Sequence, residues 1–267
     1  MRIGFIGFGE VAYTLSKKLL QNNVEVITST KGRSKKTKQL AIDSGVKILP
    51  SYEELAKQSD ILISATSPKT ALAIAKKYGI LCNGVFIDLN NISPENTKKI
   101  ANFLSENNFN PNSSFVDGII IGKISSTKST IIVSGKSSDK IAILNNYGLN
   151  VKVISHDIGD ASTIKMLRSI YTKGVTAIAY ETFQAAEQIG LSNELFEAIA
   201  ITESENFQFQ TKSRLNSLAS SKSRKFQEMD EVLDFLNSVY DEDKLEFNSC
   251  MSKATKNKFK SLKNSDF

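Results

Sequence analysis

Small residues near the start of the chain form a pattern suited to binding phosphate. Gly7-Phe8-Gly9-Glu10-Val11-Ala12 reads as GxGxxA, and it stands between an apolar run, Ile3–Ile6, and a segment with apolar residues at helical spacing. The first glycine of such a turn permits a tight bend, and the second lets the backbone approach a pyrophosphate. The following helix N-terminus offers free N–H groups to an anion. A turn without a ligand is the alternative. The context favours a dinucleotide site formed by Gly7, Phe8, Gly9, Glu10 and Val11.

The residues after the second apolar run, Val24–Thr28, indicate which dinucleotide binds. NAD-binding proteins carry an Asp or Glu about 20 residues after the glycines, where the acid binds the ribose 2′-hydroxyl. No acid stands at this position, and the sequence reads Ser29-Thr30-Lys31-Gly32-Arg33. A guanidinium group can donate two hydrogen bonds to one phosphate. Ser29, Thr30 and Arg33 therefore predict a site for the 2′-phosphate of NADP.

The elements that position these residues follow from the hydrophobic pattern. Short β-branched runs alternate with polar helical stretches, which is typical of a parallel α/β sheet. The runs are Ile3–Ile6, Val24–Thr28, Ile61–Ala65, Val85–Asp88, Phe115–Asp117 and Ile131–Val133. Between the first two, Val11, Leu15 and Leu19 share one face of a helix, as in the crossover of a βαβ unit. The pattern predicts a Rossmann-type, doubly wound parallel sheet.

The pattern changes after about Gly159. Apolar positions keep a spacing of three or four from Ser162 to Ile189, which predicts one long helix that ends near Gly190. Further helices are predicted at Glu194–Phe207, Ser213–Ala219 and Glu228–Tyr240, and the Lys-rich stretch Ser252–Phe267 fits a solvated or frayed end. We therefore expect an α/β domain at residues 1–160 and an all-α domain at residues 161–267.

Composition and charge exclude several classes of protein. The chain has 267 residues, 40% of them hydrophobic, and Lys+Arg 34 against Asp+Glu 28 gives 34 − 28 = +6. This mild excess suits anionic ligands but does not predict nucleic-acid binding. Cys82 and Cys250 lie far apart and His156 is the only histidine, so neither a disulfide framework nor a metal site is expected. No apolar stretch approaches about 18 residues, the length of a membrane span. We expect a cytoplasmic protein without a metal, nucleic-acid or membrane partner.

Four motifs together carry a family resemblance. They are Gly4–Gly9, Ser64-Ala65-Thr66-Ser67-Pro68, Asp88-Leu89-Asn90-Asn91-Ile92-Ser93-Pro94 and Gly159-Asp160-Ala161-Ser162-Thr163-Ile164-Lys165. On these residues nearly the whole chain resembles the β-hydroxyacid dehydrogenase family, which includes 3-hydroxyisobutyrate and 6-phosphogluconate dehydrogenases, and within it a small archaeal NADP-binding branch with a divergent helical C-terminal domain. The third motif is similar to the family's D-x-S-T-x-x-P. The resemblance implies that Ala65 and Thr66 border the nicotinamide and that Asn91 faces both nicotinamide and substrate.

Lys165 is similar in position to the catalytic lysine of that family, which implies that it takes or gives a proton. The positive end of a helix dipole and partial burial both ease proton release from an ammonium group. A solvated helix lysine is the alternative.

Two motifs depart from the family. Ser169 stands where an asparagine is expected, and D-A-P-V-S-G-G is recognisable only as Asp117-Gly118-Ile119-Ile120-Ile121-Gly122-Lys123.

These departures change the expected substrate site. Ser169 is at i+4 from Lys165, so its hydroxyl replaces an amide beside the lysine, and both join Asn91 as the expected catalytic residues. Arg168, the Gly122 amide and Lys123 are expected to bind an acidic substrate.

Other polar residues fit structural roles better than chemical ones. Asp88 and Asp117 each end a predicted strand, where an acid normally caps a following loop or helix. His156 fits a surface turn, and Tyr171 fits the core. The run Lys222-Ser223-Arg224-Lys225 fits a solvated loop, with a phosphate or polyanion site as the alternative.

The residues and the resemblance predict an NADP(H)-dependent oxidoreductase of the 3-hydroxyacid dehydrogenase type. It would move a hydride to or from the hydroxyl-bearing or imine carbon of a small acidic substrate. The alternative is an NADP-binding sensor or regulatory protein that has lost catalysis, because the substrate motif is altered. The long helix exceeds what a small domain needs to cover itself, so we expect a homodimer through the helical domain.

Overall fold

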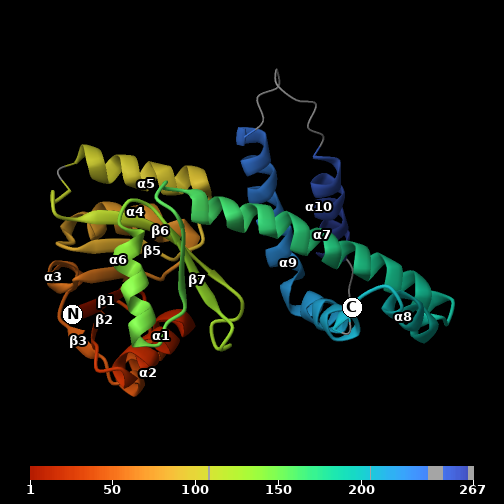
Figure 1. Cartoon of the computed structure of the whole chain (residues 1–267), viewed down its shortest axis with the longest axis horizontal. Coiled ribbons are helices and arrows are strands. Elements are labelled where there is room, and N and C mark those ends of the chain that lie inside the picture. The colour runs from red at the N-terminus through yellow and green to blue at the C-terminus, as the bar shows by residue number, and fades with distance from the viewer. Residues whose placement is uncertain (108, 205, 240–248, 264–267) are drawn as a thin grey trace. The chain divides into compact units, whose positions relative to one another are not determined.

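The computed structural model describes residues 1–107, 109–204, 206–239 and 249–263 (Figure 1). The chain divides into two compact units, Met1–Lys165 and Met166–Phe267. Within the described ranges, no helix is both long enough and apolar enough to cross a membrane.

One eight-stranded sheet with the order β3-β2-β1-β4-β5-β6-β7-β8 forms the centre of the first unit. Its strands are β1 (Arg2–Ile6), β2 (Glu25–Ser29), β3 (Lys47–Leu49), β4 (Ile61–Ser64), β5 (Val85–Asp88), β6 (Ser114–Ile121), β7 (Thr130–Ser134) and β8 (Val151–Ser155). All neighbouring pairs are parallel except β6 with β7. Because β1 lies between β2 and β4, the strand order reverses there, and the carboxyl ends of β1 and β4 border a ligand-binding crevice in sheets of this kind.

Helices cover both faces of this sheet (Figure 1). They are α1 (Glu10–Gln21), α2 (Lys35–Ser44), α3 (Tyr52–Gln58), α4 (Ala71–Lys77), α5 (Pro94–Glu106) and α6 (Ser138–Ala142), with the short 3-10 helices η1 (Pro68–Thr70), η2 (Gly79–Leu81) and η3 (Ile143–Tyr147). Residues of α1, α2 and α6 join one buried apolar cluster with the strands. Residues of α3, α4 and α5 join a second cluster. The predicted doubly wound α/β fold is confirmed.

The sheet departs from the sequence prediction in two ways. The hydrophobic pattern does not predict β3, which has only three residues, or β8, in which Lys152 interrupts the apolar run. In addition, β7 runs antiparallel to β6. Only residues 122–129 join these two strands, whereas a parallel crossover needs a dozen residues or more.

The second unit is built from helices. They are α7 (Asp160–Gln188), which begins in the first unit, α8 (Ser192–Ala200), α9 (Phe207–Val239) and α10 (Cys250–Lys263). Its buried apolar cluster consists of Met166, Ala177, Leu218, Met229, Val232, Phe235, Leu236, Phe259 and Leu262. The predicted long helix and the helical C-terminal region are confirmed.

Three predictions for the C-terminal region are wrong. The helix α9 is continuous where separate helices at Ser213–Ala219 and Glu228–Tyr240 are predicted, and Tyr240 lies outside the described residues. The run Lys222–Lys225 is therefore helical, and Arg224 forms an ion pair with Glu228 (3.7 Å). The stretch predicted as a solvated end forms α10, whose Phe259 is fully buried, although residues 264–267 lie outside the described ranges.

Candidate active site at the carboxyl edge of the sheet

The glycine turn after β1 has the geometry that a bound pyrophosphate needs. Gly7 has φ +88°, and a Cβ there would lie 2.4 Å from the Ala65 carbonyl oxygen, so only glycine fits. Gly9 differs, because a Cβ there would meet nothing within 4 Å. Gly9 is also the N-cap of α1 and has no side chain to occupy the first N–H groups of the helix. The turn thus combines a tight bend against the β4 loop with open space at a helix N-terminus.

Asn90, which sequence reasoning missed, connects the ends of β4 and β5. Its Nδ2 donates to Ser64 Oγ (2.6 Å) and to Asp88 Oδ2 (2.6 Å). Its Oδ1 accepts hydrogen bonds from the Thr66 backbone N–H and from Thr66 Oγ1. Since Asn90 is buried, these bonds fix the loop Ala65–Thr66 beside Gly7. The motif D-x-N-N held the only sequence signal for this role.

Asn91 places an unpaired acceptor next to that network. Its φ is +67°, in the left-handed region that residues other than glycine seldom adopt. Its Oδ1 is buried and has no hydrogen-bond partner among the described residues. A buried acceptor without a donor is unfavourable, so this oxygen is suited to accept a hydrogen bond from a ligand.

Asp88 holds Asn90 from the end of β5. The Asp88 carboxylate accepts from the Asn90 backbone N–H (2.9 Å) as well as from its side chain. Burial raises the pKa of Asp88 from 3.8 to about 6, and these hydrogen bonds offset part of the effect. Asp88 is therefore a structural support for the loops, in agreement with its predicted role.

The raised pKa of Asp88 predicts a pH-dependent stability. The folded protein holds this proton more tightly than the unfolded chain, so the contribution is complete below pH 3.8 and is lost as the pH rises through about 6. Asp88→Asn should remove that slope, which amounts to at most about 3 kcal/mol. Urea unfolding of both proteins between these pH values measures the difference in unfolding free energy. Parallel pH profiles for the wild type and the variant would contradict the raised pKa.

Ser29 is the last residue of β2, and Thr30 and Arg33 lie in the turn that follows it. Ser29 and Thr30 are buried. The Arg33 backbone N–H donates to the Thr30 carbonyl oxygen (3.1 Å) across a turn in which Gly32 has φ +71°. The half-buried Arg33 side chain donates from Nε to the Tyr52 hydroxyl (2.8 Å). The predicted 2′-phosphate residues thus lie at the end of β2 and in the tight turn after it, and Tyr52, which the sequence did not reveal, contacts Arg33 there.

Asp117 anchors the start of α7, the helix that carries Lys165. The buried carboxylate accepts from Ser162 Oγ (2.7 Å) and from the Ser162 backbone N–H (2.9 Å), while Ser134 Oγ accepts from the Ala161 backbone N–H (3.0 Å). Burial raises the pKa of Asp117. A carboxylate at a helix N-terminus is favourable, so Asp117 fixes the first turn of α7 as a cap.

Residues 2–92 match the family described as "NADP oxidoreductase coenzyme F420-dependent". The chain is 44% identical over 262 residues to the uncharacterized 28.5 kDa protein in the 7S RNA 5′ region of Methanothermus fervidus, which covers 98% of this chain and 99% of that protein. It is 38% identical to conserved protein MTH1747, a protein of unknown function with structural similarity to 3-hydroxyacid dehydrogenases. That match has a TM-score of 0.83 and covers 99% of this chain and 97% of the other.

The chain belongs to the 3-hydroxyacid dehydrogenase-like family. A 3-hydroxyisobutyrate dehydrogenase from Salmonella typhimurium has the same fold, with a TM-score of 0.76 at 17% identity, over 99% of this chain and 94% of that chain.

Within this 3-hydroxyacid dehydrogenase-like chain, the predicted substrate residues lie on two elements. Gly122 and Lys123 belong to the connection between β6 and β7. Gly122 has φ +89°, and a Cβ there would lie 3.5 Å from Ser129 Cα. Arg168 is exposed on α7, whereas Lys165 and Ser169 are half-buried on the same helix. That these residues form one substrate site stays a prediction.

The structure also tests the predicted environments of two further residues, His156 and Tyr171. His156 is exposed and pairs with Asp139 through Nε2 (2.9 Å), as expected for a surface histidine. Tyr171 is 67% exposed, so its predicted core position is wrong. In the part of the chain that the structure describes, no group of three or more His, Cys, Asp or Glu side chains is arranged to hold a metal ion.

Proposed function

We propose that the protein is an NADP(H)-dependent oxidoreductase that transfers a hydride between the nicotinamide and a hydroxyl-bearing or imine carbon of a small acidic substrate. The observation that carries the proposal is the turn at Gly7–Gly9, where open space at a helix N-terminus lies at the reversal of the strand order. The family description of residues 2–92 supports an NADP-linked oxidoreductase.

The residues at the edge of the sheet fit each part of NADP. Amides of Phe8, Gly9, Glu10 and Val11 would hold the pyrophosphate, because the N-terminus of α1 has free N–H groups there. Ser29, Thr30 and Arg33 would hold the 2′-phosphate, since no acid opposes it after β2. The loop Ala65–Thr66, fixed by Asn90, would border the nicotinamide, and the unpaired Asn91 Oδ1 would accept an N–H or O–H group.

The side chains of the protein would transfer a proton and bind the substrate, because the cofactor supplies the hydride chemistry. Lys165 would take the proton from the substrate hydroxyl when that carbon is oxidised, and would return a proton in the reverse direction. The Ser169 hydroxyl lies one helical turn further along α7. Arg168, Lys123 and the Gly122 amide would bind the substrate carboxylate, and the positive charges of Arg168 and Lys123 favour an acidic substrate.

A substrate screen tests this function. The purified full chain would be mixed with NADPH and small oxo acids and imines, and in the other direction with NADP⁺ and hydroxy acids, while nicotinamide absorbance is followed. Turnover of at least one acidic substrate is expected. Binding of NADPH without turnover of any compound would favour the sensor alternative instead.

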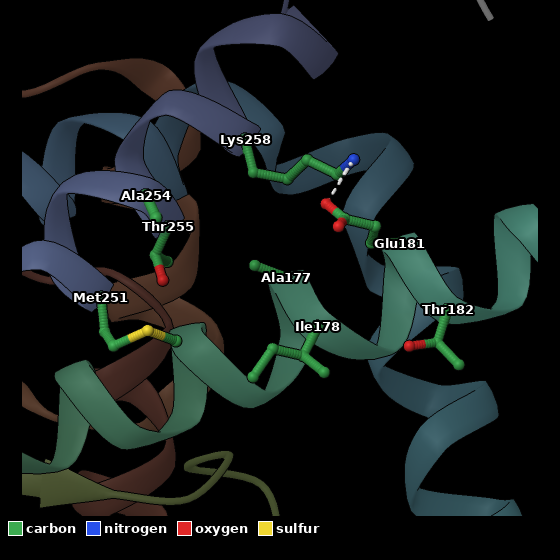
Figure 2. Close-up of a pocket in the computed structure, with 8 residues that line it drawn as sticks. All are labelled: Ala177, Ile178, Glu181, Thr182, Met251, Ala254, Thr255 and Lys258. Atoms are coloured by element: carbon green, nitrogen blue, oxygen red, sulfur yellow. Dashed lines mark ion pairs between the residues drawn. The ribbon is translucent and has the colours of Figure 1, made fainter.

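We also propose that the protein is a homodimer through its helical unit. Large apolar side chains recur on one face of α7 and are about half exposed or more, namely Leu167, Tyr171 and Ile178. Beside them, a groove between α7 and α10 is bordered by Ile178 from α7 and Met251 from α10, both exposed (Figure 2). Exposed apolar patches of this kind usually mark an interaction surface, and a second copy is the partner that symmetry favours.

Light scattering at micromolar concentration tests the dimer. The wild type is expected to have the mass of two chains, and Tyr171→Glu is expected to shift it to one chain, because a charge would be buried without a partner. Ile143→Glu changes an exposed apolar residue of η3 in the first unit and should leave the dimer intact. A wild-type mass of one chain would refute the proposal.

A further inference from the structure

Arg33 is held by a residue from a distant part of the sequence. Its Nε donates a hydrogen bond to the Tyr52 hydroxyl (2.8 Å), and its Cζ lies 5.5 Å from the centroid of the Tyr52 ring. Arg33 follows β2, whereas Tyr52 is the first residue of α3. The arginine is therefore restrained both by a hydrogen bond and by the face of an aromatic ring.

Tyr52 is itself firmly fixed. Its side chain is only 6% exposed and belongs to the apolar cluster that includes Leu49 and Leu55. Its ring contacts that of Tyr78, with the centroids 5.2 Å apart. The start of α3 is capped by Ser51, whose hydroxyl accepts from the Glu54 backbone N–H (3.1 Å). The packing of Tyr52 thus fixes the position of its hydroxyl, and the hydrogen bond to this hydroxyl can orient the Arg33 side chain.

The hydrogen bond to Tyr52 uses Nε of Arg33 and leaves the two terminal nitrogens of the guanidinium group for a ligand. Of five N–H donors, it engages the one on Nε, and the bonds among the described residues leave the four donors on the two terminal nitrogens available to an anion. Two parallel bonds from these nitrogens match two oxygens of a phosphate. The arginine backbone is also set, because the turn Thr30–Arg33 is closed by a hydrogen bond and Gly32 supplies its positive φ.

We propose that Tyr52 is a positioning residue that orients Arg33 for the 2′-phosphate and so determines the preference for NADPH over NADH. The inference rests on the proposed function, in which Arg33 binds that phosphate. An arginine that is already held in place loses less side-chain entropy when the phosphate binds, so the tyrosine strengthens binding without touching the ligand. NADH lacks the phosphate, and its affinity is therefore independent of Tyr52.

Titration of the full chain with NADPH and with NADH, followed by nicotinamide fluorescence, tests this role. Tyr52→Phe keeps the buried ring and removes the hydroxyl. It is expected to weaken NADPH about fivefold to tenfold and to leave NADH within about twofold. In an Arg33→Ala background, Tyr52→Phe should have no further effect on NADPH, because the group that it orients is absent. Tyr78→Phe, which alters the neighbouring ring, should leave the NADPH to NADH ratio unchanged.

Three results would overturn the inference while the proposed function stands. The first is a wild-type preference for NADPH that Tyr52→Phe leaves intact. The second is an equal loss of both nucleotides in Tyr52→Phe, which would indicate a role in stability alone. The third is an undiminished effect of Tyr52→Phe in the Arg33→Ala background. A wild type that binds NADPH and NADH equally would instead refute the NADP assignment, and the inference with it.

Discussion

Replacement of Lys165 by alanine is expected to lower turnover at least about a hundredfold and to leave the affinity for NADPH within about twofold. Lys165 lies in the second turn of α7, whose first turn is fixed by Asp117 through Ser162. A lysine held on a capped helix keeps one position, which proton transfer to a bound substrate requires. The proposed nucleotide contacts lie on other elements, at the ends of β1, β2, β4 and β5, so we expect nucleotide binding to be retained.

The control for this variant is Lys98→Ala, which removes an exposed lysine of α5 whose Cε would lie 3.3 Å from a Cβ at Gly159. It changes the charge near the start of α7 but leaves Lys165 in place, and turnover should stay near that of the wild type. Steady-state rates on the best substrate from the screen measure both. Wild-type turnover in Lys165→Ala would eliminate the proton-transfer role.

Removal of Arg33 is expected to abolish the preference for NADPH. Arg33→Ala should weaken NADPH about thirtyfold to a hundredfold, because the 2′-phosphate loses a charged partner, while NADH binds as before. Lys35→Ala is the matched control. It removes an exposed cation two residues further along, at the first residue of α2, and should change NADPH affinity less than about threefold.

Fluorescence titration of both variants with both nucleotides measures the effect. If Lys35→Ala lost as much NADPH affinity as Arg33→Ala, general attraction by the positive surface would explain the preference. If neither variant changed the ratio, the phosphate would be bound elsewhere.

The glycine turn and most strands were predictable because their signals are local. GxGxxA occupies six consecutive residues, and each of the six predicted apolar runs forms a strand of the sheet, although β7 pairs with β6 in the antiparallel direction. The strand β3 was missed because three residues are too few to show an alternation of apolar and polar side chains. Its hydrogen-bonded pairing with β2 defines it as a strand. The single helix α9 was predicted as separate helices because polar residues around Lys222 interrupt the apolar spacing. A contact from another helix, the ion pair of Lys173 on α7 with Glu228 (3.0 Å), is not visible in that spacing.

Residues whose role depends on a partner from another element were not predictable. Asn90 is one of two adjacent asparagines, and only the parallel pairing of β4 with β5 brings it to Ser64. Tyr52 stands beside Arg33 because α3 packs against the same part of the sheet, which no local spacing shows. Tyr171 has the spacing of a core residue, yet it is exposed, because that spacing shows which residues share a face of the helix and not what covers this face.

A side-by-side titration of the purified wild-type chain with NADPH and NADH tests the central claim most directly. We expect saturable NADPH binding that is at least about tenfold tighter than NADH binding, because Arg33 adds a charged partner for the 2′-phosphate. Failure of both nucleotides to bind would mean that the turn at Gly7–Gly9 is purely structural in this member of the family. The proposed function and every site assignment would then be contradicted, and only the fold would stand.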